Sequence, residues 1–349
     1  MTSAREQLQK LAAERILVFD GGYGTAIQNY RLGERDYRGS LELTDDQKGN
    51  NDLLSLTRPD IIEAIHTSYL EAGADIIETN TFSSTEISQA DYGCEHLVRD
   101  LNVKSAEIAR VACDKAEARD GRPRFVAGSI GPTNKTLSLS PDVNDPGFRE
   151  IDYDYLKGVY RAQCDALIEG GVDFLLIETI FDTLNAKCAG MAAMEAAEAS
   201  GRDVPLMISM TLTDLSGRNL SGHTVEAFWH AVRHLKPLTI GLNCSFGADQ
   251  LRPHLAMLAK EADCLIMAYP NAGLPNDLGE YDEMPDETAK LIGDWLKDGL
   301  VNIVGGCCGT TPEHIAAIAK AVADQKPRKI PTVPVHTRLS GLEPFNMAA

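Results

Sequence analysis

Three of the eight cysteines in this 349-residue chain lie where a thiol could do chemistry. Cys244 ends the apolar run LTIGLNC, and Cys307 and Cys308 stand side by side after the run VNIVGG. Because both runs read as strands, we expect the three side chains to emerge at a loop mouth and not in the core. Three thiolates bind zinc well and leave the fourth tetrahedral position open for a substrate sulfur. The pattern predicts a zinc site, with a vicinal or regulatory disulfide as the competing interpretation.

The other five cysteines fit a structural role. They fall within predicted helices or at the start of an apolar run, where free cysteine usually acts as a small apolar side chain. We expect these residues to be inert: Cys94, Cys113, Cys164, Cys188 and Cys264. Four histidines on predicted helices are expected to be surface or core groups and not ligands: His66, His230, His234 and His314.

Short apolar runs that should position the cysteines recur eight times along the chain. They begin at residues 16, 74, 124, 172, 205, 238, 264 and 301, and helical periodicity lies between them, as in 58–73, 154–171, 224–235 and 311–323. Near-continuous apolar strands that alternate with helices indicate a parallel sheet buried on both faces. Eight such units predict an α/β fold, a single (β/α)8 TIM barrel over residues 1–325. The alternative, an open doubly wound sheet, would normally carry a GxGxxG turn, whereas the first turn reads DGGYGT.

Barrels of this kind carry their chemistry at the C-terminal ends of the strands. Polar residues gather at those ends in this chain: Asp20, Glu78, Asn80, Ser129, Glu178, Thr211, Asn243 and Asn271. Carboxylates within apolar runs are costly to bury unless they are paired or solvated at a site. We therefore expect Asp20 and Glu178 to face a substrate, the alternative being a salt-bridged structural role.

These groups together describe a ligand. A metal held by three thiolates carries a net negative charge, which favours activation of a bound thiol, because coordination deprotonates a group whose pKa is otherwise about 8.5. Asp20 and Glu178 suit an ammonium group, while backbone N–H groups in DGGYGT (20–25) and GSIGPT (128–133) suit a carboxylate. The pattern predicts an amino acid that bears a thiol.

The composition disfavours several classes of partner. The 33 basic and 51 acidic residues give a net charge of -18, which disfavours binding to nucleic acid or to an anionic membrane. No stretch reaches the roughly 18 apolar residues that a membrane span needs, and the N-terminal segment has no long apolar core. We expect a cytoplasmic protein with reduced thiols.

Seven segments carry a resemblance to a known family. They are DGGYGT, GADIIETNTF, AGSIGPTN, LLIETIFDT, GLNCSFG, AYPNAGLPN with GEYDE, and NIVGGCCGTTPEHI, and they span roughly residues 16–325. The chain resembles the homocysteine-binding, N-terminal module of cobalamin-dependent methionine synthase, one of the zinc-dependent homocysteine S-methyltransferases. The GLNC and GGCC pair is specific to that superfamily, whereas AYPNAGLPN, GEYDE and RLSGLEP (338–344) favour the cobalamin branch.

The resemblance implies a role for each candidate site residue. It implies that the catalytic zinc is held by Cys244, Cys307 and Cys308 and the homocysteine amino group by Asp20 and Glu178. The family's backbone contacts to the substrate carboxylate map to Gly21, Gly22 and Ser129. Methylcobalamin would give its methyl group to the deprotonated thiol and form methionine and cob(I)alamin, and no general base is needed once zinc has replaced the proton.

The resemblance also implies partners. The DxHxxG motif, whose histidine ligates cobalt in that family, is absent from this sequence. Methylcobalamin would therefore be supplied in trans by corrinoid-binding and methyltetrahydrofolate-binding modules. The Pro-containing segment 326–349 reads as a tail or linker, either of a truncated longer enzyme or of a split subunit that docks a corrinoid protein.

Two further interpretations stay open. One is a homocysteine methyltransferase that takes its methyl group from S-methylmethionine or betaine. The other is a non-enzymatic zinc- or thiol-binding scaffold, in which a fourth protein ligand such as Asn243 closes the metal site.

Overall fold

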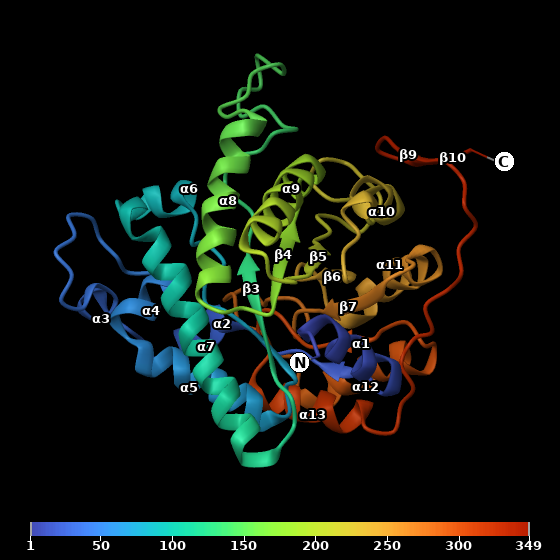
Figure 1. Ribbon diagram of the computed structural model, residues 1–349, viewed down its shortest axis with the longest axis horizontal. Helices are drawn as coiled ribbons and strands as arrows, with labels where there is room; N and C mark the ends of the chain where they lie inside the picture. Colours follow the sequence, from blue (N-terminus) through green and yellow to red (C-terminus); the bar gives the residue numbers. More distant parts are fainter. Residues whose placement is uncertain (1, 348–349) are drawn as a thin grey trace.

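The computed structural model describes residues 2–347, and in it eight parallel strands form a barrel surrounded by helices (Figure 1). The strands are β1 (Leu17–Val18), β2 (Ile76–Glu78), β3 (Phe125–Ile130), β4 (Phe174–Ile180), β5 (Leu206–Met210), β6 (Thr239–Asn243), β7 (Leu265–Tyr269) and β8 (Ile303–Val304). They pair in the order β1-β8-β7-β6-β5-β4-β3-β2. A parallel bridge between Phe19 and Ile76 joins β1 to β2 and closes the sheet. The predicted (β/α)8 barrel is confirmed.

The helices that follow the strands form the outer layer. They are α5 (Pro59–Ala72), α7 (Val98–Asp120), α8 (Tyr153–Glu169), α9 (Thr183–Ser200), α10 (Val225–Val232), α11 (Ala248–Glu261), α12 (Pro285–Lys297) and α13 (Pro312–Val322). Local signals account for their ends. In α5, for example, Pro59 occupies the first turn and Gly73 ends the helix with a φ of 115°, a conformation that suits glycine.

The remaining helices do not belong to this layer: α1 (Ala4–Glu14), α2 (Tyr23–Gln28), α3 (Glu34–Arg38), α4 (Leu54–Thr57), α6 (Glu86–Gln89), and the 3-10 turns η1 (Asn51–Leu53), η2 (Ala90–Tyr92), η3 (Glu95–Leu97) and η4 (Arg233–Leu235). Helix α1 packs Leu8 and Ala12 into the apolar cluster inside the barrel. Among the described residues, no helix combines the length and the apolar character needed to cross a membrane.

The segment predicted as a tail or linker lies on the barrel. It runs past α11 and forms a hairpin of β9 (Arg338–Ser340) and β10 (Pro344–Asn346) beside α10 (Figure 1). Ser340 Oγ donates to the Ala227 carbonyl at 2.6 Å, and the Thr224 N–H donates to the Leu342 carbonyl at 3.1 Å. We call residues 338–346 the C-terminal hairpin.

Strand periodicity explains which side chains reach the top of the barrel interior. Alternate residues of a strand face the same side. In β4, Phe174 and Leu176 belong to the apolar cluster inside the barrel, so the next inward position is Glu178. In β3 and β7 the same alternation makes Ser129 and Tyr269 the next inward-facing residues after the apolar ones. The barrel interior is therefore apolar below and polar at the C-terminal end of the strands.

One buried carboxylate holds the seam between β1 and β2. The Asp75 side chain is fully buried and accepts hydrogen bonds from the guanidinium groups of Arg15, at 2.7 and 2.8 Å, and of Arg122, at 2.8 Å. It also accepts from the Val18 N–H at 2.9 Å, and its own N–H donates to the Val18 carbonyl at 2.7 Å. Two cations make burial of this carboxylate tolerable.

Asp75→Asn should lower the free energy of unfolding by about 2–3 kcal/mol, because a hydrogen bond to a charged group is worth roughly that much. Urea denaturation measures the change. Asp60→Asn is the control, since the Asp60–Arg58 pair is exposed and its loss should cost less than about 0.5 kcal/mol. Equal effects of the two substitutions would show that the seam does not depend on Asp75.

Candidate active site

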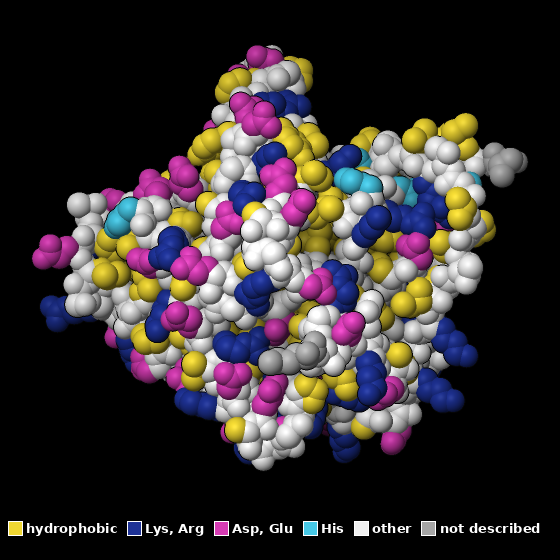
Figure 2. Space-filling view, viewed as in Figure 1, with side chains coloured by type: hydrophobic (Ala, Val, Ile, Leu, Met, Phe, Trp, Pro, Cys, Tyr) yellow, Lys and Arg dark blue, Asp and Glu magenta, His cyan; other side chains and the backbone are white. Residues whose placement is uncertain are grey.

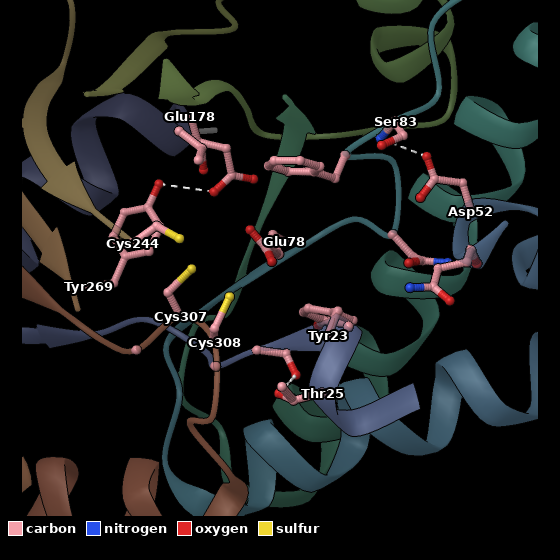
Figure 3. A pocket seen from close by; sticks show the side chains of 18 of the residues that line it. Tyr23, Thr25, Asp52, Glu78, Ser83, Glu178, Cys244, Tyr269, Cys307 and Cys308 are labelled. Carbon is pink, nitrogen blue, oxygen red and sulfur yellow. Dashed lines mark hydrogen bonds between the residues drawn. The ribbon is translucent and has the colours of Figure 1, made fainter. Parts of the chain in front are cut away.

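The three cysteines predicted as a metal site lie together at the C-terminal end of the barrel. Cys244 follows β6, Cys307 and Cys308 follow β8, and their sulfurs lie within 4.8 Å of one another. Figure 3 shows the three sulfurs pointing toward one another. Strand β7 separates β6 from β8, and both loops bind its end: the Cys244 N–H donates to the Tyr269 carbonyl at 3.3 Å and the Cys307 N–H to the Pro270 carbonyl at 2.8 Å. The end of β7 thus sets the distance between the thiols.

Three residues around the cysteines have strained backbones. Thr179, Cys244 and Ser245 have φ values of 56°, 61° and 60°, in the left-handed region that costs a residue other than glycine about 1–3 kcal/mol. The Asn243 side chain holds the first of them: its Oδ1 accepts from the Thr179 N–H at 3.1 Å, and its Nδ2 donates to Thr179 Oγ1 at 2.8 Å. Strain concentrated at one place is typical of a functional site.

The DGG turn after β1 packs directly on the cysteine loop. A Cβ added to Gly22 would lie 2.6 Å from the Cys307 carbonyl oxygen, and one added to Gly21 would lie 2.7 Å from the Thr310 carbonyl oxygen. Any side chain at these positions would push the loop and its thiols away. Both glycines also line the cavity beside the thiols.

Hydrogen bonding separates the pKa values of the thiols. Hydrogen bonds from Cys244 and Cys307 lower the pKa of Cys308 to about 3, and the Tyr281 hydroxyl contributes to the same shift. Hydrogen bonding to Cys244 and Cys308 raises the pKa of the Cys307 thiol well above its ordinary value. One thiol is thus ready to ionise, and three convergent sulfurs form a donor set that fits zinc.

A cavity of about 310 Å³ opens beside the sulfurs, and carboxyl groups form part of its wall (Figure 3). Glu178 accepts hydrogen bonds from the Tyr269 hydroxyl at 3.1 Å and from Ser129 Oγ. Burial raises the pKa of Glu178, and these hydrogen bonds oppose the rise. Burial and the neighbouring Glu178 raise the pKa of Glu78 well above its ordinary value, and Glu78 Oε2 has no hydrogen-bond partner in the part of the chain that the structure describes.

Asp20 lies behind this wall and is fully buried. Its Oδ2 accepts from the Glu78 N–H at 2.8 Å and from the Tyr23 hydroxyl at 3.0 Å, whereas its Oδ1 has no hydrogen-bond partner among residues 2–347. Burial raises the pKa of Asp20 well above its ordinary value. Unpartnered buried carboxyl oxygens beside a cavity indicate a missing donor, such as a cationic group of a ligand.

The backbone groups predicted for a substrate carboxylate are partly occupied. The Gly22 N–H donates to the Thr310 carbonyl at 3.2 Å, and the Ser129 N–H donates to Thr79 Oγ1 at 3.0 Å. Gly21 and Gly22 line the cavity, but Ser129 does not; its hydroxyl reaches the cavity only through Glu178. A carboxylate at Gly22 would have to displace the contact with Thr310.

Sequence reasoning missed several polar residues of the cavity. Tyr269, Tyr23 and Asp52 line it, and strand periodicity in β7 could have found Tyr269. Nothing in the sequence distinguished Asp52, which accepts from the Ser83 N–H at 2.7 Å and Ser84 Oγ at 2.9 Å and whose pKa burial raises to about 7. The other five cysteines lie outside the thiol cluster, four of them buried and Cys264 half-buried.

Comparison with known proteins identifies the family. Residues 17–322 match the family model described as Homocysteine S-methyltransferase. The chain belongs to the homocysteine S-methyltransferase family. Two solved structures of homocysteine methyltransferase MmuM from Escherichia coli share the fold. The metallated form has a TM-score of 0.69 at 22% identity and covers 89% of this chain and 98% of its own. The oxidized form has a TM-score of 0.68 at 23% identity and covers 87% and 95%.

In the metal-free protein, Cys308 should react with iodoacetamide fastest at pH 6. Its lowered pKa keeps it a thiolate there, whereas thiols of ordinary pKa, about 8.5, are protonated. Mass spectrometry after brief labelling of the reduced protein identifies the site. Cys308→Ser should remove the fast reaction and Cys264→Ser should not. Labelling spread evenly over Cys244, Cys307 and Cys308 would contradict the assignment.

Proposed function

We propose that the protein transfers a methyl group to the sulfur of L-homocysteine and forms methionine, with zinc bound by Cys244, Cys307 and Cys308. One observation carries the proposal: three thiols converge on a cavity that Glu178 and Glu78 also line, with the unpartnered Asp20 Oδ1 behind. Sulfur donors at one side and carboxyl groups at another match the two ends of an amino acid thiol. Zinc on three thiolates supplies the charge that keeps the substrate sulfur deprotonated at neutral pH.

The carboxyl groups would hold the substrate amine. Glu178 takes the ammonium group at the cavity wall and Asp20 acts on it from behind that wall, and Glu78 is in charge contact with both carboxyl groups. An ammonium group next to the carboxylates favours their ionised form, so it offsets the rise in their pKa that burial causes. Tyr269 and Ser129 donate to Glu178 and orient it. The substrate carboxylate would lie toward the cavity wall that Gly21 and Gly22 form. Ser129 does not line the cavity, and its role would be to hold Glu178.

The methyl donor that we propose is methylcobalamin carried on a separate module or polypeptide. A cavity of about 310 Å³ is at the lower limit of ligand pockets and holds an amino acid, so a corrinoid must present its methyl group from outside. Exposed apolar side chains near the mouth suit such a partner: Phe82 on the cavity wall, and Leu274, Leu278 and Met284 on the β7–α12 connection. The partners would be corrinoid-binding and methyltetrahydrofolate-binding modules.

A small free donor, S-methylmethionine or betaine, is the second candidate. The metallated structure of homocysteine methyltransferase MmuM from Escherichia coli aligns with this chain over 98% of its own length, and this likeness supports the second candidate. The scaffold interpretation is less favoured, because Asn243 Oδ1 accepts from Thr179 N–H and from Ser209 Oγ at 2.6 Å and would lose both bonds as a metal ligand.

Three free thiols suit a reducing compartment, so we propose a cytoplasmic location.

Methionine formation from homocysteine by the zinc-loaded protein, with each donor offered separately, tests the reaction. Cys308→Ala should lose bound zinc and at least about 100-fold in rate, since a catalytic metal contributes several kcal/mol. Cys264→Ala should keep both. Product from methylcobalamin alone supports the proposed donor. Product from S-methylmethionine or betaine supports a small free donor, the second candidate. No product from any donor with zinc bound contradicts the proposed reaction.

Glu178→Gln should raise the KM for homocysteine about 10- to 100-fold without loss of zinc, because a hydrogen bond to a charged group is worth about 1.5–3 kcal/mol. Steady-state kinetics with the donor that works, and zinc analysis, measure both effects. The control substrate is 4-mercaptobutyrate, which lacks the amino group and should be used equally by the two proteins. A KM that rises equally for both thiols would contradict the role of Glu178 in holding the amine.

A further inference from the structure

A second group of metal-ligating side chains lies in the helical layer of the barrel. Figure 2 shows histidine side chains on the surface over α10 and the C-terminal hairpin, and the group that contains the buried His230 lies beneath this surface. One atom each of Glu226, His230 and Glu261 lies within 4.8 Å of the others. None of the three residues lines the cavity beside the thiols. The group is therefore separate from the proposed active site.

The fold holds these side chains together. Glu226 and His230 are four residues apart on α10, so they share one helix face, and Glu226 Oε1 lies 4.0 Å from His230 Nε2. Glu261 is the last residue of α11, and its backbone carbonyl accepts from Trp229 Nε1 at 3.1 Å. Because Trp229 precedes His230 on α10, this bond fixes the end of α11 beside the imidazole.

The His230 ring has polar neighbours but no hydrogen bond of normal geometry within the described residues. Its side chain is fully buried, and neither Nδ1 nor Nε2 makes a hydrogen bond within the described residues. The Leu339 backbone, in the C-terminal hairpin, lies near the ring, but burial prevails and lowers the pKa of His230. A buried polar group without a partner costs about 1–3 kcal/mol. The neutral ring offers an unused lone pair between two carboxylates, which is what a metal ion requires.

The charged groups around this cluster are compatible with a bound cation. Glu226 and Glu261 bring two carboxyl groups to the cluster, and a divalent ion would balance the charge of two carboxylates. Two groups of the C-terminal hairpin also face this cluster: Asn346 Nδ2 donates to Glu226 Oε1 at 3.2 Å, and the Arg338 guanidinium is close enough to lower the pKa of His230. Arg338 donates to the Pro334 carbonyl at 3.0 Å, and within residues 2–347 it forms no ion pair with Glu226 or Glu261.

We propose that Glu226, His230 and Glu261 form a second divalent-cation site, with nitrogen and oxygen ligands, beneath the C-terminal hairpin. An imidazole ligand favours Zn²⁺, Co²⁺ or Mn²⁺ over Mg²⁺ or Ca²⁺. Ligand atoms at about 2.1 Å from a tetrahedral ion lie about 3.4 Å apart, so the side chains must close by about 1 Å around it. The ion ties α10 to α11 at the place where the hairpin lies on the barrel.

Cobalt binding to the full chain tests the proposal. The thiol cluster and the second site differ in spectrum, since only thiolate ligands give intense charge-transfer absorption in the near ultraviolet. Wild type should bind two equivalents of Co²⁺ in equilibrium dialysis, the thiol cluster giving the intense band and the second site adding only weak visible absorption. His230→Ala should bind one equivalent and keep the intense band, while His234→Ala, an exposed histidine just after α10, should bind two.

Glu261→Gln keeps the test decisive if His230→Ala does not fold, because Glu261 is only partly buried. It should weaken the second equivalent at least 10-fold and leave the thiolate band unchanged. Zinc added beyond the first equivalent should raise the Tm of wild type but not of Glu261→Gln. One equivalent of Co²⁺ on wild type, or two on both Glu261→Gln and His230→Ala with unchanged affinity, would overturn the proposal.

Discussion

Convergence of three thiols at the end of a closed barrel is the constraint on which the rest of the structure depends. Cys244 and the Cys307–Cys308 pair come from strands that are not neighbours, and they meet because both loops bind the end of β7. Closure of the barrel then brings the DGG turn after β1 onto the cysteine loop, where only glycine fits. Left-handed backbones at Cys244, Ser245 and Thr179 show that the arrangement is held against local preference.

The electrostatics of the cavity are incomplete in the protein alone. The sulfurs lie at one side and the carboxyl groups of Asp20, Glu78 and Glu178 at another, and burial raises the pKa of each carboxyl group. Such a cluster ionises readily only when positive charge enters it. A metal at the thiols and an ammonium group at the carboxylates supply that charge at two separate points. Under the proposed function, these two points would bind the thiol and the amine of one substrate.

Much of this arrangement follows from sequence pattern. Eight apolar runs predicted the barrel, and the rule that strand ends carry chemistry selected Asp20, Glu178 and the three cysteines. Depth within the barrel could not be predicted in the same way. The β1 run does not show that Asp20 lies behind the cavity wall, since that depends on its hydrogen bonds to Glu78 and Tyr23. Nor does it show that the Gly22 N–H is occupied by Thr310, which is distant in sequence.

Long-range packing also accounts for two features that the sequence pattern did not predict. The segment 326–349 stays predicted as a tail or linker, and within it Ser340 and Leu342 bind α10. His230 was expected to be exposed or satisfied, but it is buried and unpartnered beneath that hairpin. Neither outcome has a local signal, because each depends on contacts between segments more than one hundred residues apart, as the Ser340–Ala227 hydrogen bond is.

Proton release on substrate binding tests the central claim most directly. Homocysteine added to the zinc-loaded protein in weak buffer near pH 7 should release about one proton for each molecule bound, because a thiol of ordinary pKa must lose its proton at the metal site. Homoserine, which has a hydroxyl group in place of the thiol, should release none, and the chelated protein should release none with either ligand. Homocysteine binding without proton release, or equal release after chelation, would contradict a thiol-activating metal at Cys244, Cys307 and Cys308.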